Sequence, residues 1–177
     1  MTKFAVLAAT VGVLAWAAPA RAAETKVELK SVHMCCPGCA EEVEAVLKKV
    51  EGVTGVAVEQ KTRTARFTAT DANAAQKALD ALAAEGFHGD TGGAKDFAFK
   101  DDSGVKPGQV KSLTVTGFHN SCPGCAKSFR EAIKDVKGVT GDNAKSKVTT
   151  AEVTGEFDAA ELVKALNKAG FHVKVKQ

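Results

Sequence analysis

The chain has 177 residues, of which 25% are charged and 6% aromatic, and its formal net charge is +3 at pH 7. Nucleic-acid binding normally depends on clustered basic residues and on aromatic side chains that stack against bases. This chain has no clustered basic run, no Tyr and a single Trp. The composition therefore argues against a nucleic-acid partner.

Residues 1–22 have the pattern of a secretory signal peptide. Lys3 supplies the positive start, residues 4–18 form an apolar run, and small residues that suit cleavage precede and include Ala22. Such a run is too short for a membrane span, and its flanks favour a signal over the alternative of a buried N-terminal helix. Removal of Lys3 and Arg21 lowers the 24 Lys and Arg to 22, against 21 Asp and Glu. We expect an exported protein, periplasmic or secreted, that is not embedded in a membrane when mature.

The remaining sequence contains an internal repeat. Residues 33–40 and 119–126 share the pattern H-x-x-C-P-G-C-A, and Gly-Phe-His occurs at 86–88 and again at 170–172. A repeat of this kind indicates duplicated structural units rather than one domain of the same length. We predict a first domain over residues 24–90, a linker over 91–109 and a second domain over 110–177.

The linker is rich in Gly and charged residues, which is typical of a connecting segment. Phe97-Ala98-Phe99 is the exception. Two interpretations remain open for it: a short edge strand packed on the first domain, or an apolar stretch of linker.

Each domain is predicted to follow the order β-α-β-β-α-β. Alternating apolar residues precede the first cysteine pair, and helical spacing of apolar residues follows it over 40–50 and 126–136. Gly52 and Gly138 are placed to end this first helix. A hairpin follows, which should be shorter in the second domain because residues 142–145 lack the Val pair of the first.

The second helix should begin at Asn73 in the first domain and at Asp158 in the second, because Gln or Glu stands three residues later, as in a capping box. Gly86 and Gly170 should stop it. The last strand is clear around Val173 in the second domain and weak in the first.

Each C-P-G-C segment falls where a strand turns into a helix. Pro37 suits the first helical position, so Cys36 lies near the helix N-terminus, where unpaired amides favour a thiolate. The spacing lets Cys36 and Cys39 face one point, and such a soft dithiolate suits Cu(I), and also Zn(II), Hg(II) or Cd(II). Cys122 and Cys125 repeat the arrangement. The alternative is a plain disulfide in an oxidising compartment.

With C-x-x-C at the first strand–helix junction, the β-α-β-β-α-β order resembles the heavy-metal-associated domain family. That family includes copper chaperones, modules of copper-transporting ATPases and periplasmic mercury-binding proteins. The resemblance implies an α+β fold of two tandem ferredoxin-like βαββαβ domains. It also implies that two cysteine pairs bind the metal: Cys36 with Cys39, and Cys122 with Cys125.

The chain departs from the family motif G-M-T-C-x-x-C at several positions. His33 and His119 replace its Gly, Asn120 its Met and Cys35 its Thr. Each His can complete a His–Cys–Cys set for trigonal Cu(I) or four-coordinate Zn(II), or can face solvent at a strand end. Cys35 can be a third sulfur ligand, or can form a disulfide-linked dimer with another chain.

The function predicted from these features is that of an exported, non-enzymatic protein that carries or sequesters a soft metal ion through a C-x-x-C dithiolate in each domain. Cu(I) is favoured, with zinc or mercury as alternatives, and the partner would be a metal-transporting or metal-accepting protein with its own Cys pair. One competing hypothesis is a periplasmic thiol–disulfide oxidoreductase that uses the C-P-G-C pairs. Another is a protein-interaction module whose cysteines are structural.

Overall fold

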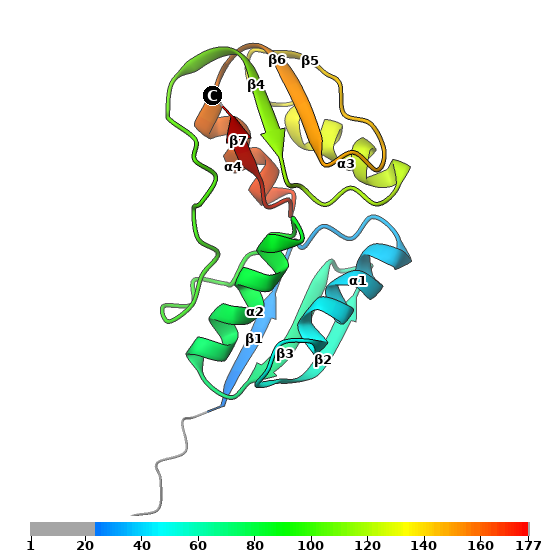
Figure 1. Ribbon diagram of the computed structural model, residues 1–177, viewed down its shortest axis with the longest axis vertical. Coiled ribbons are helices and arrows are strands. Elements are labelled where there is room, and N and C mark those ends of the chain that lie inside the picture. The colour runs from blue at the N-terminus through cyan, green and yellow to red at the C-terminus, as the bar shows by residue number, and fades with distance from the viewer. Residues whose placement is uncertain (1–23, 177) are drawn as a thin grey trace, which may run out of the picture.

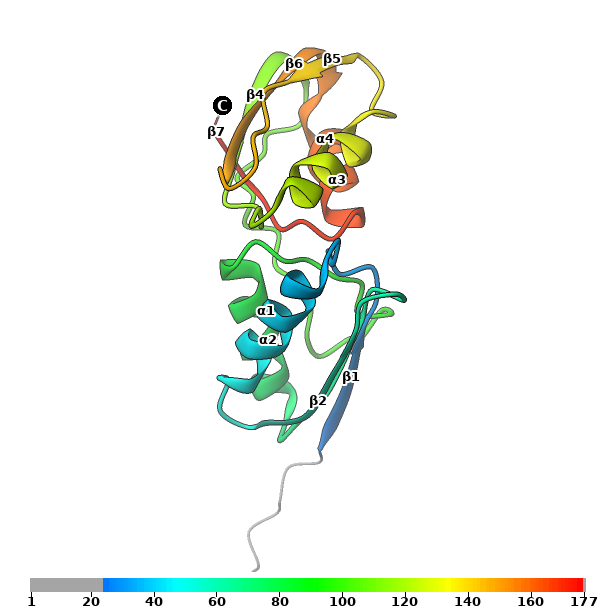
Figure 2. The same ribbon diagram turned by 90° about the vertical axis from the view of Figure 1, so that its right-hand side faces the viewer.

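The computed structural model describes residues 24–176 and contains two α+β domains joined by a linker (Figure 1). The predicted signal peptide, residues 1–22, lies outside the described residues. In each domain two helices cover one face of an antiparallel sheet (Figure 2). Within residues 24–176, no helix is both long enough and apolar enough to cross a membrane.

The first domain has a three-stranded sheet in the order β1-β3-β2. A single bridge between Lys30 and Asp90 takes the place of the last strand, as the weak pattern after His88 predicted. The elements are β1 Thr25–Leu29, α1 Pro37–Lys48, β2 Val53–Glu59, β3 Thr64–Ala69 and α2 Ala72–Ala84.

The second domain has the complete four-stranded sheet in the order β5-β6-β4-β7. Its β5 has 4 residues where β2 has 7, so the prediction of a shorter hairpin is confirmed. The elements are β4 Gln109–Thr116, α3 Pro123–Ile133, β5 Val139–Asp142, β6 Thr150–Asp158, α4 Ala159–Lys168 and β7 Lys174–Lys176. Both domains thus have the predicted ferredoxin-like architecture.

The predicted start of α2 and the predicted ends of α1 and α3 are wrong. The N-cap of α2 is Asp71, not Asn73, because Asp71 has the extended backbone and its carboxylate accepts a hydrogen bond from the Ala74 amide. The helices α1 and α3 end several residues before Gly52 and Gly138. These glycines instead turn the chain into the next strand, with φ of 82° and 90°.

The predicted start of α4 and the predicted ends of α2 and α4 are confirmed. Asp158 caps α4 by accepting hydrogen bonds from two backbone amides of its first turn. Gly86 and Gly170 follow α2 and α4 in the left-handed conformation. After each glycine the phenylalanine amide bonds back to a helix carbonyl, from Phe87 to Leu82 and from Phe171 to Leu166, which is the Schellman arrangement.

The linker contacts both domains instead of crossing open solvent. Phe97 packs into the first core, and the Gln76 side chain bonds both the amide and the carbonyl of Ala98. Further on, the Asp102 carboxylate lies 2.7 Å from His172 Nε2 of the second domain, and the Ser103 carbonyl accepts from the Val175 amide. Residues 97–99 therefore pack on the first domain without forming a strand.

The domains meet through their repeated Gly-Phe-His segments. The His88 amide donates to the Gly170 carbonyl at 2.8 Å, and the His172 amide donates to the Gly86 carbonyl at 2.9 Å. These reciprocal bonds join equivalent positions of the two repeats. A Cβ added at Gly86 or at Gly170 would overlap backbone atoms of the other domain. The close approach of the domains therefore requires glycine at both positions.

Candidate metal centre

Each C-x-x-C segment begins a helix at the junction between the domains. Cys36 and Cys122 are the N-cap residues of α1 and α3, with Pro at the first helical position of each, as predicted. A hydrogen bond from the Cys39 backbone amide lowers the pKa of the Cys36 thiol. Cys39 and Cys125 lie on the buried faces of their helices and are 0% exposed.

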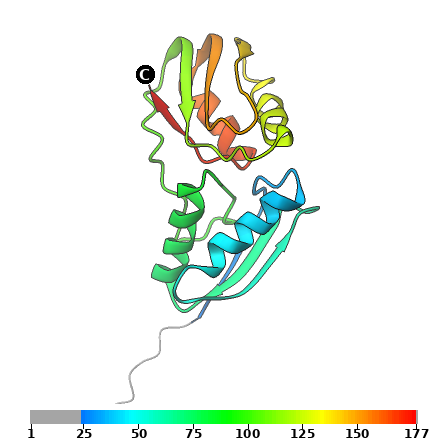
Figure 3. The same ribbon diagram turned by 45° about the vertical axis from the view of Figure 1, so that its right-hand side comes forward.

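The start of α1 lies at the end of the first domain that faces the second (Figures 1 and 3), and the cysteine pairs of the two domains contact each other across this boundary. Within the domains, Cys36 and Cys39 have their sulfurs 3.3 Å apart, and Cys122 and Cys125 have theirs 3.5 Å apart. Across the boundary, Cys39 and Cys125 are separated by 3.8 Å and Cys36 and Cys122 by 3.7 Å. The sulfurs are thus nearly as close between the domains as within them.

Cys35 lies in the middle of this group. Its sulfur is 3.6 Å from that of Cys39, and 3.5 Å from each of Cys122 and Cys125 in the other domain. All five cysteines are free thiols. Burial raises the pKa of the Cys35 thiol. The cysteine without a counterpart in the repeat therefore joins the two pairs into one cluster of five sulfurs, which we call the thiol cluster.

The thiol cluster and His33 together form two overlapping groups of four potential ligands. In each group the ligand atoms all lie within 4.8 Å of one another: Cys35, Cys36, Cys39 and Cys122 in one, and His33, Cys35, Cys39 and Cys125 in the other. A tetrahedral ion with metal–sulfur bonds of about 2.3 Å requires sulfurs about 3.8 Å apart. The observed separations are close to that value, so the side chains need little movement to surround a soft ion.

Hydrogen bonds within the cluster favour ionisation of the Cys125 thiol over that of Cys39. The hydrogen bond between the two buried sulfurs lowers the pKa of Cys125 and raises that of Cys39. Hydrogen bonds from His119 and His33 lower the pKa of Cys125 further. A metal ion that binds here displaces the remaining thiol protons, so its affinity should rise with pH.

His33 and His119 are buried, at 2% and 5% exposure, so the alternative of a strand-end residue facing solvent is wrong. Each ring stacks on the phenylalanine of the other domain: His33 on Phe171 and His119 on Phe87, both with centroids 4.1 Å apart. His33 belongs to one of the four-ligand groups, and its buried Nε2 has no hydrogen-bond partner among residues 24–176. Burial lowers the pKa of His33, which keeps the imidazole neutral and able to donate a lone pair.

His119 takes a different place. Its Nε2 lies 3.0 Å from Ser121 Oγ and 3.8 Å from a Glu42 carboxylate oxygen. It therefore borders the thiol cluster and interacts with Cys125, whereas His33 lies inside a ligand group. The other two histidines, His88 and His172, pack against Phe99 of the linker and stay outside both ligand groups.

Arg63 supports the first metal loop and was missed in the sequence. Its guanidinium donates to the carbonyls of Ser31 and Val32, at 3.0 and 3.1 Å, just before His33. It also donates to the Ala169 carbonyl of the second domain. Asn120 supports the second loop, because its amide bonds the carbonyls of residues 145 and 148. Neither role has a signal in the sequence, since the partners come from distant segments.

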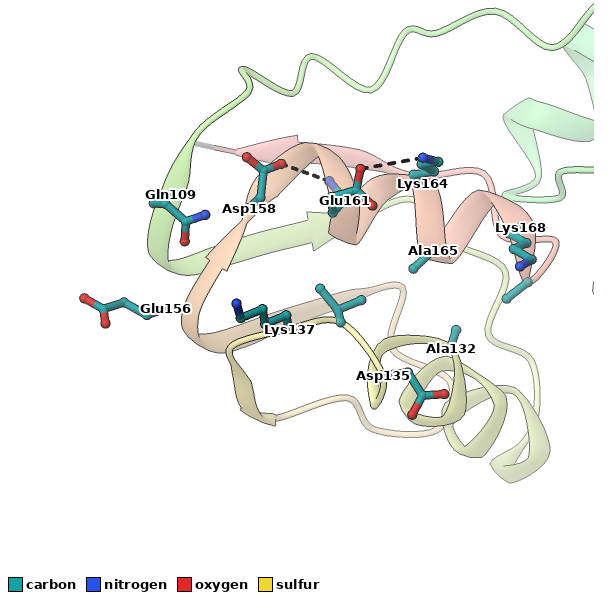
Figure 4. A pocket seen from close by; sticks show the side chains of 12 residues that line it. Gln109, Ala132, Asp135, Lys137, Glu156, Asp158, Glu161, Lys164, Ala165 and Lys168 are labelled. Carbon is teal, nitrogen blue, oxygen red and sulfur yellow. Dashed lines mark hydrogen bonds and ion pairs between the residues drawn. The ribbon is translucent and has the colours of Figure 1, made fainter.

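A cavity formed by the described residues reaches the thiol cluster at Cys35. It has a volume of about 290 Å³, and its wall includes Cys35, His33 and Arg63 of the first domain and Glu131 of the second. A larger cavity of about 860 Å³ lies in the second domain between α3 and α4 (Figure 4). Over the described residues its lining contains neither Cys nor His, and Glu161 pairs there with Lys164. Of these two cavities, the smaller one is lined by a cysteine of the thiol cluster.

The sequence profile of the heavy-metal-associated domain matches residues 28–88 and 121–172. Among solved structures, oxidized MerP from Ralstonia metallidurans CH34 is 36% identical over 34% of this chain and 86% of its own, with a TM-score of 0.32. The N-terminal soluble domains of Bacillus subtilis CopA are 19% identical over 88% of this chain and 95% of theirs, with a TM-score of 0.30. The water-soluble region of the P-type ATPase CopA from the same organism is 20% identical over 88% and 93%, also with a TM-score of 0.30. No curated protein matches the chain.

Proposed function

Because the chain belongs to the heavy-metal-associated domain family, we propose that it binds Cu(I) through the cysteine pairs of both domains and passes the ion to a partner. The observation that carries this proposal is the convergence of five sulfurs at separations of 3.3 to 3.8 Å. Thiolates are soft ligands and select Cu(I) over harder ions. Zn(II) and Hg(II) are the competing ions, since both also accept thiolate ligands.

Transfer would proceed by ligand exchange. A thiolate from a partner's Cys pair would bind the ion and add one sulfur to its ligands. One thiolate of this chain would then dissociate from the ion, which restores the original number of ligands. No electron changes hands in this step. The cavity of about 290 Å³ beside Cys35 offers the incoming thiolate a path to the cluster. With residues 1–22 as a signal peptide, the exchange would take place outside the cytoplasm.

The test is a titration of the reduced chain, residues 23–177, with Cu(I) and separately with Zn(II), each against a competing chelator. Serine at Cys36, Cys39, Cys122 and Cys125 together should abolish tight Cu(I) binding, because only one thiol remains. Met34→Leu is the matched control, since Met34 lies in the same loop and is buried. Wild-type affinity in the quadruple variant would refute the assignment of the ligands.

The position of Cys35 bears on the predicted dimer. Its sulfur faces three other sulfurs of the same chain, which favours a role as ligand over an interchain disulfide. Non-reducing gels of the wild type and of Cys35→Ser test this directly. Dimer that disappears in the variant would restore the interchain role.

A thiol–disulfide oxidoreductase is the second candidate. The lowered pKa of Cys36 and its distance of 3.3 Å from Cys39 favour it, because a low-pKa thiol at a helix N-terminus reacts readily with disulfides. The reduction potential of the cysteine pairs, measured by equilibration with glutathione, tests the oxidoreductase function. A potential between about −270 and −120 mV would be that of a catalytic disulfide, and one below about −300 mV that of a structural one.

A further inference from the structure

We propose that the two domains form a single metal site, in which the first ion binds thiolates of both domains with Cys35 among its ligands, so that metal binding holds the domains together. This inference rests on the proposed function and deepens it. Two independent sites, one in each domain, are the alternative. They would bind ions without any effect on how the domains are arranged.

The distances favour the shared site. Cys39 and Cys125 come from different domains, are both 0% exposed, and lie 3.8 Å apart. An ion held by Cys36 and Cys39 alone would still lie against the sulfur of Cys122, which is 3.7 Å from that of Cys36. In the docked arrangement, an ion in either pair therefore meets thiolates of the other domain.

Cys35 makes this sharing asymmetric. It belongs to the first domain, yet two of the three sulfurs in contact with it, those of Cys122 and Cys125, belong to the second. Cys35, Cys39 and Cys125 form a triangle with edges of 3.5 to 3.8 Å, which is the size that a three-coordinate or four-coordinate soft ion needs. Both four-ligand groups contain Cys35 and Cys39, so a second ion would share these two sulfurs with the first.

The surface between the domains is built from the same repeat as the metal loops. Gly86 and Gly170 allow the backbones to approach, the reciprocal bonds of His88 and His172 align them, and the two His–Phe stacks cross the boundary. The stacks include His33, which is itself in a ligand group. The docking surface and the metal ligands are therefore parts of one unit.

This arrangement has a consequence for affinity and for release. Joining two tethered binding elements on one ion raises affinity by about 10²- to 10⁴-fold, because the second element is already at high effective concentration. Conversely, separation of the domains would remove ligands from the ion and expose the buried sulfurs of Cys39 and Cys125. An acceptor thiolate that stabilises the separated domains would thereby favour release.

The decisive variants are Gly86→Ala and Gly170→Ala, each in the full mature chain. The new methyl group would overlap backbone of the other domain, at His119 in the first variant and at His33 in the second. Gly117→Ala is the matched control. Gly117 has φ of 77°, against 78° for Gly86, so alanine carries the same backbone strain there, but its methyl group would meet no atom of the described residues within 4 Å. Circular dichroism of each variant verifies that the domains remain folded.

In titrations with Cu(I), we expect both interface variants to bind the first ion about 100-fold more weakly than Gly117→Ala, the lower end of the gain from tethering. Cys35→Ser should also weaken the first ion while leaving both pairs intact. Equal first-ion affinities in Gly86→Ala, Gly170→Ala and Gly117→Ala would overturn the shared site. Absence of Cu(I) binding in the wild type would instead overturn the proposed function, and the inference with it.

Protection from alkylation gives an independent reading. With one equivalent of Cu(I), the wild-type chain is alkylated and the modified cysteines are mapped by mass spectrometry. A shared site protects cysteines of both domains in the same molecule, Cys35 included. Molecules that are protected only at Cys36 and Cys39, or only at Cys122 and Cys125, would show independent sites and refute the inference.

Discussion

Replacement of Phe97 by alanine should release the linker from the first domain. Phe97 is 9% exposed and packs in the first core, while the Gln76 side chain holds Ala98 by its amide and carbonyl. Phe99 adds a stack on His88, with centroids 4.4 Å apart. The Phe97 ring is the largest apolar contact of this segment, so we expect its removal to dominate the free energy of local opening.

The size of the effect follows from the buried area. A buried Phe removes about 150 to 250 Å² from water, which at about 25 cal/mol per Å² is worth about 4 to 6 kcal/mol. The linker lies at the surface and can collapse onto the space left by the ring, so the cost should fall at the low end of the range for Phe→Ala, about 3 kcal/mol. Each 1.4 kcal/mol changes an equilibrium about tenfold. The fraction of open linker should therefore rise about 100-fold.

Limited proteolysis with trypsin measures this opening, because Lys95 and Lys100 flank the segment. When opening and closing are fast relative to cleavage, the cleavage rate follows the opening equilibrium. Phe97→Ala should be cut about 100-fold faster at these lysines than the wild type. Val148→Ala, at a side chain that is 45% exposed, is the control and should be cut at the wild-type rate. A change of less than about threefold in Phe97→Ala would refute the idea that this ring anchors the linker.

Three other changes test the site and the fold. His33→Ala combined with His119→Ala should weaken Zn(II) binding more than Cu(I) binding, since the thiolates of the cluster can satisfy Cu(I) without an imidazole. Affinities of the double variant for both ions, measured between about pH 5.5 and 8, decide this. Equal losses for both ions would contradict the ligand role. Asp158→Ala should lower the free energy of unfolding by about 1 kcal/mol, because two backbone amides of α4 lose the carboxylate that caps them. Thermal unfolding of this variant is compared with that of Asp135→Ala, at an exposed side chain, and equal stabilities of the two variants would contradict the capping role. Burial lowers the pKa of His88 from 6.5 to about 4, so the folded chain resists the proton that the unfolded chain accepts, and stability should fall as pH drops from about 6.5 to 4. His88→Phe should flatten that part of the melting-temperature profile of the metal-free chain, and an unchanged slope would assign the acid sensitivity to other groups.

Much of the fold could be predicted from the sequence because it depends on neighbouring residues. The repeat predicts two domains, and the alternating and helical periods of apolar residues predict the order of strands and helices. Gly86 and Gly170 end their helices as predicted, since a left-handed residue after the last turn is a local requirement. Among the boundaries that differ from the prediction, Asn73 lies two residues from the true cap at Asp71. Both residues are good caps, and only the extended backbone of Asp71 selects between them.

Part of the site was also within reach of the sequence. Cys39 stands four residues before Val43 and eight before Leu47, so the helical period alone places it on the buried face of α1. The same period places Cys125 inward on α3, four residues before Phe129. A second cysteine on the buried face of each helix indicates that another part of the chain packs over its sulfur.

Only the tertiary structure shows which part of the chain covers these two buried cysteines. The sequence by itself determined two ferredoxin-like domains with a thiol pair at the start of a helix in each, because hydrogen-bonding pattern, helical period and capping are properties of contiguous residues. The meeting of those pairs, the central place of Cys35 and the burial of His33 against Phe171 depend on how two separate surfaces dock. Docking joins segments more than 80 residues apart, such as Gly86 and Gly170. The periodicity of neighbouring residues cannot predict that two glycines so far apart in the sequence will each face the other's domain. The shared thiol cluster therefore exists only in the folded, docked chain.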